Sequence, residues 1–265
     1  MALIVWILLF CLLGGVLSVL AAGLFLLFPS AMRARLLPHL ISFATGALLG
    51  AALLALLPHA LLDGRADPHL IGITLLGGLL MFFLLEKMVL WRHFHYVGNG
   101  EADDDPAVVS ESDGHGHHAD GTLILIGDGL HNFVDGVLIA AAFLTDIHLG
   151  IVTALAVAAH EVPQEVGDFA ILLNSGFSRA RALAFNVLSS LATVVGGVLA
   201  WAALQEFEPV QPYVLAVAAA SFLYVAVADL IPGLHRHTDL RSGASQIALI
   251  LLGVAVIALA HSALH

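Results

Sequence analysis

Long runs of hydrophobic residues recur along the whole chain, broken by Pro, Gly and charged residues. A helical run of about 20 residues crosses about 30 Å of hydrocarbon. The pattern therefore predicts an all-α, polytopic membrane protein with eight transmembrane helices in a single transmembrane domain, 1–265. The expected helices are Leu3–Phe28, His39–Leu62, Leu70–Trp91, Thr122–Thr145, Leu149–Asn174, Ala180–Leu204, Val210–Ile231 and Ala244–Leu264. The first run is expected to be a retained span, because it is too long for the apolar part of a signal peptide.

The basic residues support this number of spans. With eight spans, nearly all of them fall on one side of the membrane, and only Arg65 falls on the other. The positive-inside rule makes the basic side cytoplasmic, so both termini are expected outside. The residues on the basic side are Arg33, Arg35, Lys87, Arg92, Arg179, Arg181, Arg236 and Arg241.

Composition restricts the class of protein further. Hydrophobic residues make up 60% of the chain and charged residues 11%, whereas soluble domains carry about 25% charged residues. The few basic residues are scattered between apolar segments, so no nucleic-acid partner is expected and the lipid bilayer is the expected surrounding. Cys11 is the single cysteine, which excludes a disulfide framework or a thiolate metal cage within the chain.

The segment 93–120 is the one long connection between the predicted spans. It is acidic, contains glycines and has few large apolar residues, so we expect a mobile cytoplasmic loop. Its His115–His118 tract is a candidate for weak metal binding, since neutral imidazole is a common metal ligand. A solvated linker is the alternative.

Two predicted spans carry acidic and imidazole side chains deep within their apolar sequence. These residues are Asp128, His131, Asn132 and Asp135 in the fourth span and His160, Glu161, Gln164, Glu165 and Asp168 in the fifth. Each charge near the bilayer centre costs about 2.5–3.5 kcal/mol on insertion scales. Neither span contains Lys or Arg. The compensating positive charge must therefore come from protons or from a bound cation.

Helical spacing favours the cation. At about 100° per residue, the polar residues of each span share one face, with Glu165 just beside the face of the fifth. Two such faces turned toward each other would offer imidazole nitrogen, carboxylate oxygen and amide oxygen to one small volume. This mixture suits Zn²⁺, Fe²⁺, Mn²⁺ or Cd²⁺ better than Ca²⁺ or Mg²⁺. Pro163 cannot donate to the carbonyl of Ala159 and is expected to kink the fifth span.

Three other interpretations remain open at this point. The polar residues could simply hydrogen-bond helices together. His160-Glu161 begins a string like the HExxH of intramembrane zinc proteases, but position 164, where the second His is needed, is Gln. A proton-linked carrier would use the carboxylates, although it has less need of the paired His and Asn.

At these residues the chain resembles the ZIP (Zrt/Irt-like) metal transporters, nearest the branch with an HExPHE-type fifth helix. The resemblance rests on HNFVDG at His131–Gly136 and HEVPQEVGDFAIL at His160–Leu172. Weaker matches are Phe43–Leu61, the Glu86-Lys87 pair and Ser221–Pro232.

The resemblance implies a ZIP-like bundle of eight helices, a homodimer and a two-metal centre between the fourth and fifth helices. It assigns His131, His160 and Gln164 to one metal, and Asn132, Asp135, Glu161 and Gln164 to the other. It also implies transport into the cytoplasm by one helix bundle sliding against another. The chain departs from the family in having Gln164 for His, Ala51 and Ala55 for Asp and His, and no acid in the sixth helix, where Asn186 and Ser190 are the polar candidates.

We therefore expect a transporter of divalent metal, Zn²⁺ before Fe²⁺, Mn²⁺ or Cd²⁺, and not an enzyme. No phosphate-binding loop is present in the sequence, so no nucleotide is expected. The inner cell membrane is the favoured location, with an organelle membrane as the alternative.

Overall fold

The computed structural model describes residues 2–97, 115–235 and 240–264, and side chains for 2–88, 124–235 and 242–263. Every regular element in this part of the chain is helical. The elements are α1 (Leu3–Leu12), η1 (Leu13–Leu17), α2 (Ser18–Phe25), α3 (Ser30–Gly50), η2 (Ala51–Leu56), α4 (Leu57–Leu62), α5 (Pro68–Val97), α6 (His115–Thr145), α7 (Ile147–Asn174), α8 (Arg179–Leu204), η3 (Glu208–Val210), α9 (Gln211–Tyr224), η4 (Val225–Leu230), α10 (Ile231–Leu234) and α11 (Leu240–Leu264). The all-α prediction is confirmed for these residues.

Three of the long helices contain a π-helical turn. η1 joins α1 to α2, η2 joins α3 to α4, and η4 joins α9 to α10, in each case without a break. Seven helices of the described chain are long and apolar enough to cross a membrane. They cover Leu3–Phe25, Ser30–Leu62, Pro68–Met88, Ile124–Thr145, Arg179–Leu204, Glu208–Leu234 and Ser242–Ala263. α7 is not among them, because its polar residues lower its mean hydropathy.

Several helices are longer than the hydrophobic pattern predicts. α3 begins at Ser30 instead of His39, with Pro38 inside the helix. Pro38 removes only the hydrogen bond to the carbonyl of Ala34, so the helix continues through it. α5 and α6 extend into the segment expected to be a loop, since 93–97 and 115–120 are helical. The rest of that loop, and the side chains of the His115–His118 tract, lie outside the described residues.

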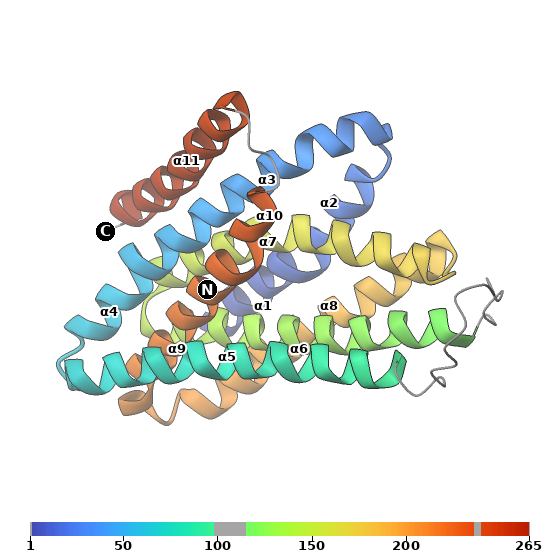
Figure 1. Cartoon of the computed structure of the whole chain (residues 1–265). Helices are drawn as coiled ribbons and strands as arrows, with labels where there is room; N and C mark the ends of the chain where they lie inside the picture. Colours follow the sequence, from blue (N-terminus) through green and yellow to red (C-terminus); the bar gives the residue numbers. More distant parts are fainter. Residues whose placement is uncertain (1, 98–114, 236–239, 265) are drawn as a thin grey trace.

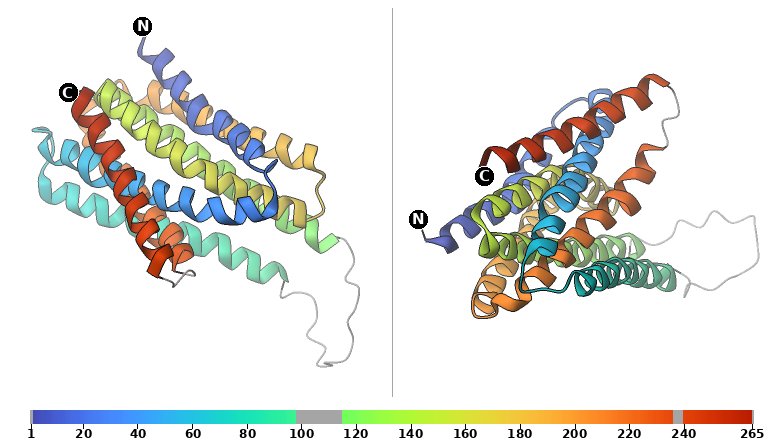
Figure 2. Two further views of the ribbon diagram at one scale, coloured as in Figure 1. Left: turned by 90° about the horizontal axis from the view of Figure 1, so that it is seen from above. Right: turned by 90° about the vertical axis from the view of Figure 1, so that its left-hand side faces the viewer.

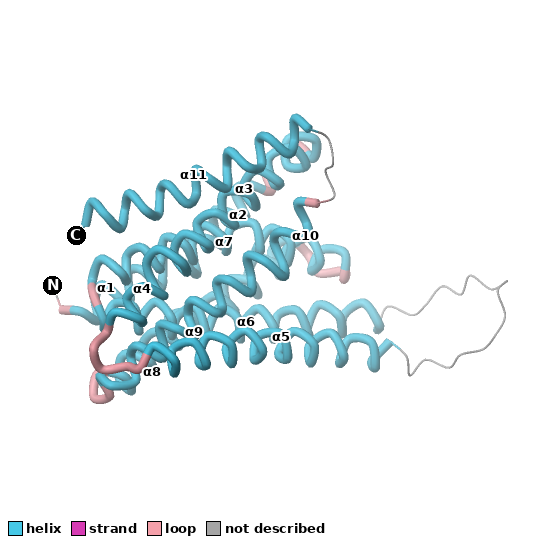
Figure 3. Tube along the Cα trace, turned by 60° about the vertical axis from the view of Figure 1, so that its left-hand side comes forward, coloured by secondary structure: helices cyan, strands magenta, loops and turns pink. Residues whose placement is uncertain are grey.

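When the continuous pairs α1–α2, α3–α4 and α9–α10 are each taken as one long helix, the helices form a bundle in which successive long helices run antiparallel (Figures 1 and 2). The first residues of α1 and the last of α11 lie at one end of the bundle, and α5 ends and α6 begins at the other (Figure 3). α7 contacts α2, α3, α6, α8 and α11, so it occupies a central position. Its polar residues are therefore packed among other helices.

Glycines allow two helix pairs to pack with their backbones in close contact. A Cβ atom at Gly136 of α6 would lie 1.9 Å from the Thr193 carbonyl oxygen of α8. A Cβ at Gly46 of α3 would lie 2.0 Å from the Ile250 carbonyl oxygen of α11. Small residues at helix interfaces permit this approach within a membrane. The α6–α8 contact also determines which α8 side chains reach the polar face of α6.

Candidate metal centre

α6 and α7 form a hairpin whose connection is a single residue. Asp146 separates the two helices, and its Oδ1 accepts hydrogen bonds from the backbone N–H groups of His148 (2.8 Å) and Leu149 (3.0 Å). This N-cap satisfies two of the amides that the start of α7 leaves unpaired. The hairpin fixes the register in which the polar face of α6 meets that of α7.

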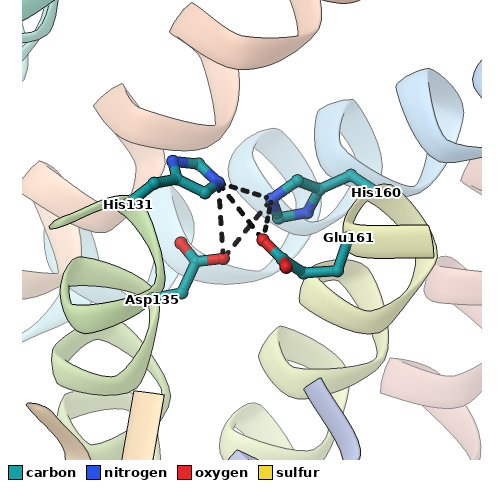
Figure 4. Close-up of side chains that lie close together, drawn as sticks. All are labelled: His131, Asp135, His160 and Glu161. Carbon is teal, nitrogen blue, oxygen red and sulfur yellow. Dashed lines mark hydrogen bonds and ion pairs between the residues drawn. The ribbon is translucent and has the colours of Figure 1, made fainter. Parts of the chain in front are cut away.

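Four side chains from this hairpin converge on one point, two from each helix (Figure 4). We call His131, Asp135, His160 and Glu161 the four-residue cluster; one ligand atom from each lies within 4.8 Å of every other. His131 Nε2 lies 3.2 Å from His160 Nε2 and 3.3 Å from Glu161 Oε1. His160 Nε2 lies 3.3 Å from Asp135 Oδ2. The two predicted faces are thus turned toward each other.

These separations match the edges of a small coordination shell. Donor atoms about 2.0–2.1 Å from a shared tetrahedral zinc ion lie roughly 3.3–3.4 Å apart. The two remaining contacts to imidazole are longer, 3.7 Å from His160 Nε2 to Glu161 Oε1 and 3.8 Å from His131 Nε2 to Asp135 Oδ2. Two imidazole nitrogens with two carboxylates form a donor set that zinc accepts. The cluster therefore has both the size and the chemistry of a zinc site.

The carboxylates of the cluster are deeply buried. The side chains of Asp135, His160 and Glu161 are 1% exposed, whereas that of His131 is 22% exposed. Neither Asp135 nor Glu161 has a hydrogen-bond partner for its carboxylate oxygens within the described chain. An uncompensated buried carboxylate is costly, so this arrangement requires a cation or protons. His131 is the least buried member of the cluster.

His160 is held in an orientation suited to metal binding. Its Nδ1 lies 3.1 Å from the carbonyl oxygen of Ala156, one turn earlier in α7. Donation from Nδ1–H to this carbonyl leaves Nε2 with its lone pair directed at the cluster. Phe222 of α9 makes an edge contact with the imidazole, with ring centroids 6.2 Å apart.

Asn132 points to α8 instead of joining the cluster. Its Nδ2 donates to Asp128 Oδ1 (2.8 Å), and its Oδ1 accepts a hydrogen bond from Thr193 Oγ1 (2.8 Å). Asp128 Oδ2 in turn accepts a short hydrogen bond from Ser189. Neither Ser189 nor Thr193 is among the residues predicted for the site. The signal was present in the polar positions at 186, 189, 190 and 193, which share one face of an otherwise apolar helix.

The other three predicted ligands follow the cluster along α7. Gln164 and Asp168 are partly exposed, and Glu165 is fully buried. Of the nine predicted site residues, the structure thus brings four into one cluster and places Asn132 and Asp128 in a hydrogen-bond network with α8. The assignment of all nine residues as metal ligands stays a prediction, and the convergence of four of them supports it.

Comparison with known proteins identifies the family. Residues 98–261 match the family model described as ZIP zinc transporter. The chain is 35% identical to human zinc transporter ZIP5 over 263 residues, which cover 77% of this chain and 49% of that protein. It is 31% identical to zinc transporter ZIP13 of Pongo abelii over 236 residues, which cover 84% of this chain and 66% of that protein.

A shorter stretch is more similar still. Over 110 residues, 42% of this chain, it is 46% identical to zinc transporter ZIP10 of Danio rerio, of which it covers 13%. The chain thus spans between 13% and 66% of the length of these relatives. The family match covers more than half of the chain and includes both helices of the cluster. From the helical fold and this match we conclude that the chain belongs to the ZIP zinc transporter family.

Proposed function

We propose that this chain moves a divalent transition metal, with Zn²⁺ as the preferred ion, across a membrane and into the cytoplasm through the four-residue cluster. The observation that carries the proposal is the convergence, between α6 and α7, of two imidazoles and two buried carboxylates whose oxygens accept no hydrogen bond from the described residues. No Lys or Arg in either helix could neutralise them. A cation that binds and leaves is the simplest source of the missing charge.

Eight crossings with both termini outside agree with this proposal. α7 would add one span to the seven that are apolar enough, for a total of eight. It packs among these membrane-spanning helices although its own hydropathy is lower. The start of α1 and the end of α11 lie at the same end of the bundle (Figure 3), as an even number of crossings requires. Arg33, Arg35, Arg179 and Arg181 would then face the cytoplasm with the 93–120 loop.

Metal number and preference depend on residues beside the cluster. Gln164 offers a neutral amide oxygen, and it would bind metal less strongly than the His found at this position in the branch with an HExPHE-type fifth helix. Asn132 donates to Asp128 and accepts from Thr193, so a second metal there would have to break these hydrogen bonds. We propose one dominant ion in the cluster, with Fe²⁺, Mn²⁺ and Cd²⁺ as competing substrates, no nucleotide, a homodimer as the assembly and the inner cell membrane as the location.

A zinc protease is the enzyme alternative that the sequence raises. Its motif needs a second His one turn after His160, and Gln164 occupies that position. We therefore propose that the chain is not an enzyme. In a protease, Glu161→Gln would abolish cleavage and leave metal bound; in the transporter, Glu161 is a ligand and the same change weakens metal binding.

Uptake by proteoliposomes tests the function directly. The chain is reconstituted and uptake of Zn²⁺, Fe²⁺, Mn²⁺ and Cd²⁺ is measured, with and without a pH gradient. Protein-dependent, saturable zinc uptake is expected, and empty liposomes are the control. Proton flux that persists when all transition metals are chelated, with no metal uptake, would instead identify a proton-linked carrier and refute the proposal.

A further inference from the structure

The α2–α3 and α7–α8 connections lie at the same end of the bundle (Figures 1 and 2), and each is followed by two arginines. Arg33 and Arg35 are in the first two turns of α3, and Arg179 and Arg181 are in the first turn of α8. Three of the four are exposed; Arg33 is partly buried, and its Nε has no hydrogen-bond partner within the described chain. We call these four residues the basic corner.

The described residues provide no counter-charge for the basic corner. The arginine ion pairs in this part of the chain are both made by Arg65, in the turn between α4 and α5 at the opposite end of the bundle. Arg65 donates to Asp63 at 2.7 and 2.9 Å and to Glu208 at 3.3 Å. The single arginine at one end is thus paired, whereas the charge of the basic corner is available to another partner.

Side-chain packing brings the two pairs of arginines to one surface. Leu26, in the turn between α2 and α3, packs against one group of buried residues together with Leu37 of α3, and against a second group that contains Ala182 of α8. Arg33 precedes Leu37 by one helical turn, and Arg181 directly precedes Ala182. Both pairs therefore lie close to the α2–α3 turn.

Large apolar side chains are exposed beside the basic corner. Leu27 and Phe28 in the turn are 75% and 45% exposed, and Met32 and Leu36, one turn apart on α3, are 44% and 37% exposed. Arginines next to exposed apolar residues are typical of the membrane boundary. There the apolar side chains enter the hydrocarbon and the guanidinium groups reach the lipid headgroups.

Helix lengths place the basic corner at this boundary. The first span, Leu3–Phe25, has 23 residues, which is about 35 Å of helix and enough to cross about 30 Å of hydrocarbon. The turn after it and the first turns of α3 therefore lie at the level of the headgroups. α8 is also long enough to cross, with 26 residues from Arg179 to Leu204, so its first turn lies at a boundary as well.

We infer that the basic corner binds anionic phospholipids of the surrounding bilayer, with its guanidinium groups on the headgroup phosphates. Guanidinium N–H groups match the geometry of phosphate oxygens and form bidentate hydrogen bonds with them. A zwitterionic headgroup carries its own cation, so the unpaired charge of the corner favours anionic lipid. Each arginine near an anionic membrane surface strengthens binding by about fivefold. The inference needs only a chain that spans a membrane, so it does not depend on the proposed function.

Lipid bound at the basic corner would also stabilise α7. Phe25 at the end of α2 is buried with Val166 of α7, and Leu26 and Leu37 pack against this pair. A lipid that holds the α2–α3 turn therefore restrains the part of α7 that follows the four-residue cluster. Anionic lipid is thus expected to raise the unfolding temperature of the chain.

Lipid retention by the full chain tests the inference. The chain is reconstituted in nanodiscs of equal parts phosphatidylcholine and phosphatidylglycerol and transferred to detergent, and the lipids that stay bound are counted by native mass spectrometry. Arg33→Gln with Arg35→Gln, and Arg179→Gln with Arg181→Gln, each remove the charge of one pair. The same pairs changed to Lys keep the charge, and Arg65→Gln is the matched control at the opposite end.

The wild type and the Arg65→Gln control are expected to retain phosphatidylglycerol in preference to phosphatidylcholine. Each Gln pair should lower this preference by at least about fivefold, whereas the Lys pairs should keep it. Phosphatidylglycerol should also raise the unfolding temperature of the wild type above its value in pure phosphatidylcholine, and that of the Gln pairs by less. Unfolding in pure phosphatidylcholine identifies any variant that has not folded.

Two results would overturn the inference. One is that either Gln pair, although folded, retains phosphatidylglycerol as the wild type does. The other is that the wild type shows no preference between the two lipids. In that case the arginines serve another anion, such as the acidic residues in the segment 101–113 of the chain.

Discussion

His131 Nε2 and His160 Nε2 lie 3.2 Å apart, across the interface of α6 and α7. At this distance the two nitrogens must have either a proton or a metal ion between them, because their two lone pairs would otherwise repel each other. Asp135 and Glu161 beside them supply negative charge that favours either cation. The first two predictions distinguish the metal from the proton.

Replacing either histidine is expected to abolish zinc uptake. His131→Ala or His160→Ala removes a nitrogen ligand and leaves the carboxylates with no strong partner. Removing a residue that only hydrogen-bonds to a metal ligand lowers metal affinity by roughly 10–100-fold. Removing the ligand itself is expected to lower zinc affinity by more. Uptake in proteoliposomes and zinc binding in nanodiscs provide the measurements. His69→Ala, at an exposed position on α5, is the control, and uptake retained by both cluster variants would refute the ligand assignment.

Zinc affinity is expected to fall as the pH falls. Metal binding requires neutral imidazole and ionised carboxylate, so protons compete with zinc for all four ligands. An imidazole in water takes up a proton near pH 6.5, and the competition should be visible between about pH 7.5 and 5.5. Zinc titration at several pH values checks this. A flat profile over this range would argue against imidazole ligands.

Gln164→His is expected to strengthen zinc binding. Position 164 lies one turn beyond His160 and is partly exposed, so an imidazole there can approach the cluster. Replacing an amide by an imidazole adds a better zinc ligand, and a gain of about tenfold in affinity is expected. Competition with a zinc chelator measures it. Gln164→Asn, which keeps the amide on a shorter side chain, should bind more weakly than the wild type.

Gly136→Ala is expected to destabilise the chain and weaken zinc binding. The new Cβ would lie 1.9 Å from the Thr193 carbonyl oxygen, so α6 and α8 must move apart. Overpacking of this kind costs about 1–3 kcal/mol, and the separation stretches the Asn132–Thr193 hydrogen bond. Thermal unfolding in nanodiscs reports the loss. Gly127→Ala on the same helix meets nothing within 4 Å and should leave the unfolding temperature unchanged or higher.

The turn between α4 and α5 contributes a small, pH-dependent stability. Hydrogen bonds from Arg65, at 2.7 and 2.9 Å, lower the pKa of Asp63. A carboxyl group whose pKa is lowered by folding stabilises the fold at pH values above its pKa in the unfolded chain, about 3.9. This stabilisation is lost as the pH falls through the pKa in the folded chain. Arg65 is 41% exposed, so Arg65→Ala should cost about 1 kcal/mol or less at pH 7 and less still at pH 2. Unfolding at both pH values measures the difference.

The central part of the site could be predicted from the sequence. Charged and imidazole residues without Lys or Arg, repeated at helical spacing on two neighbouring spans, indicated two faces that must meet. The structure turns these faces toward each other at His131 and His160. The prediction succeeded because a buried charge restricts the fold far more than a leucine, which is equally stable against lipid or protein.

Other features depended on contacts that a single sequence does not reveal. From the sequence, the amide of Asn132 could face either the metal or α8. Its partner Thr193 lies 61 residues away on α8, and the two meet only because of how α8 packs against α6. The start of α3 at Ser30 was missed because Pro38 and two arginines indicated a break. A π-helical turn differs from an α-helical turn only in that each hydrogen bond spans five residues instead of four. The spacing of hydrophobic residues does not reveal this difference.

The low hydropathy of α7 has a consequence for how the protein is made. The transfer of α7 by itself from the translocation channel into lipid releases little free energy, because lipid offers its carboxylates and imidazoles no hydrogen-bond partners. α6 is joined to it by Asp146 alone and carries the complementary polar face. The two helices should therefore enter the bilayer together as a preassembled hairpin. The polar residues proposed to bind the metal would then also determine how this segment is inserted into the membrane.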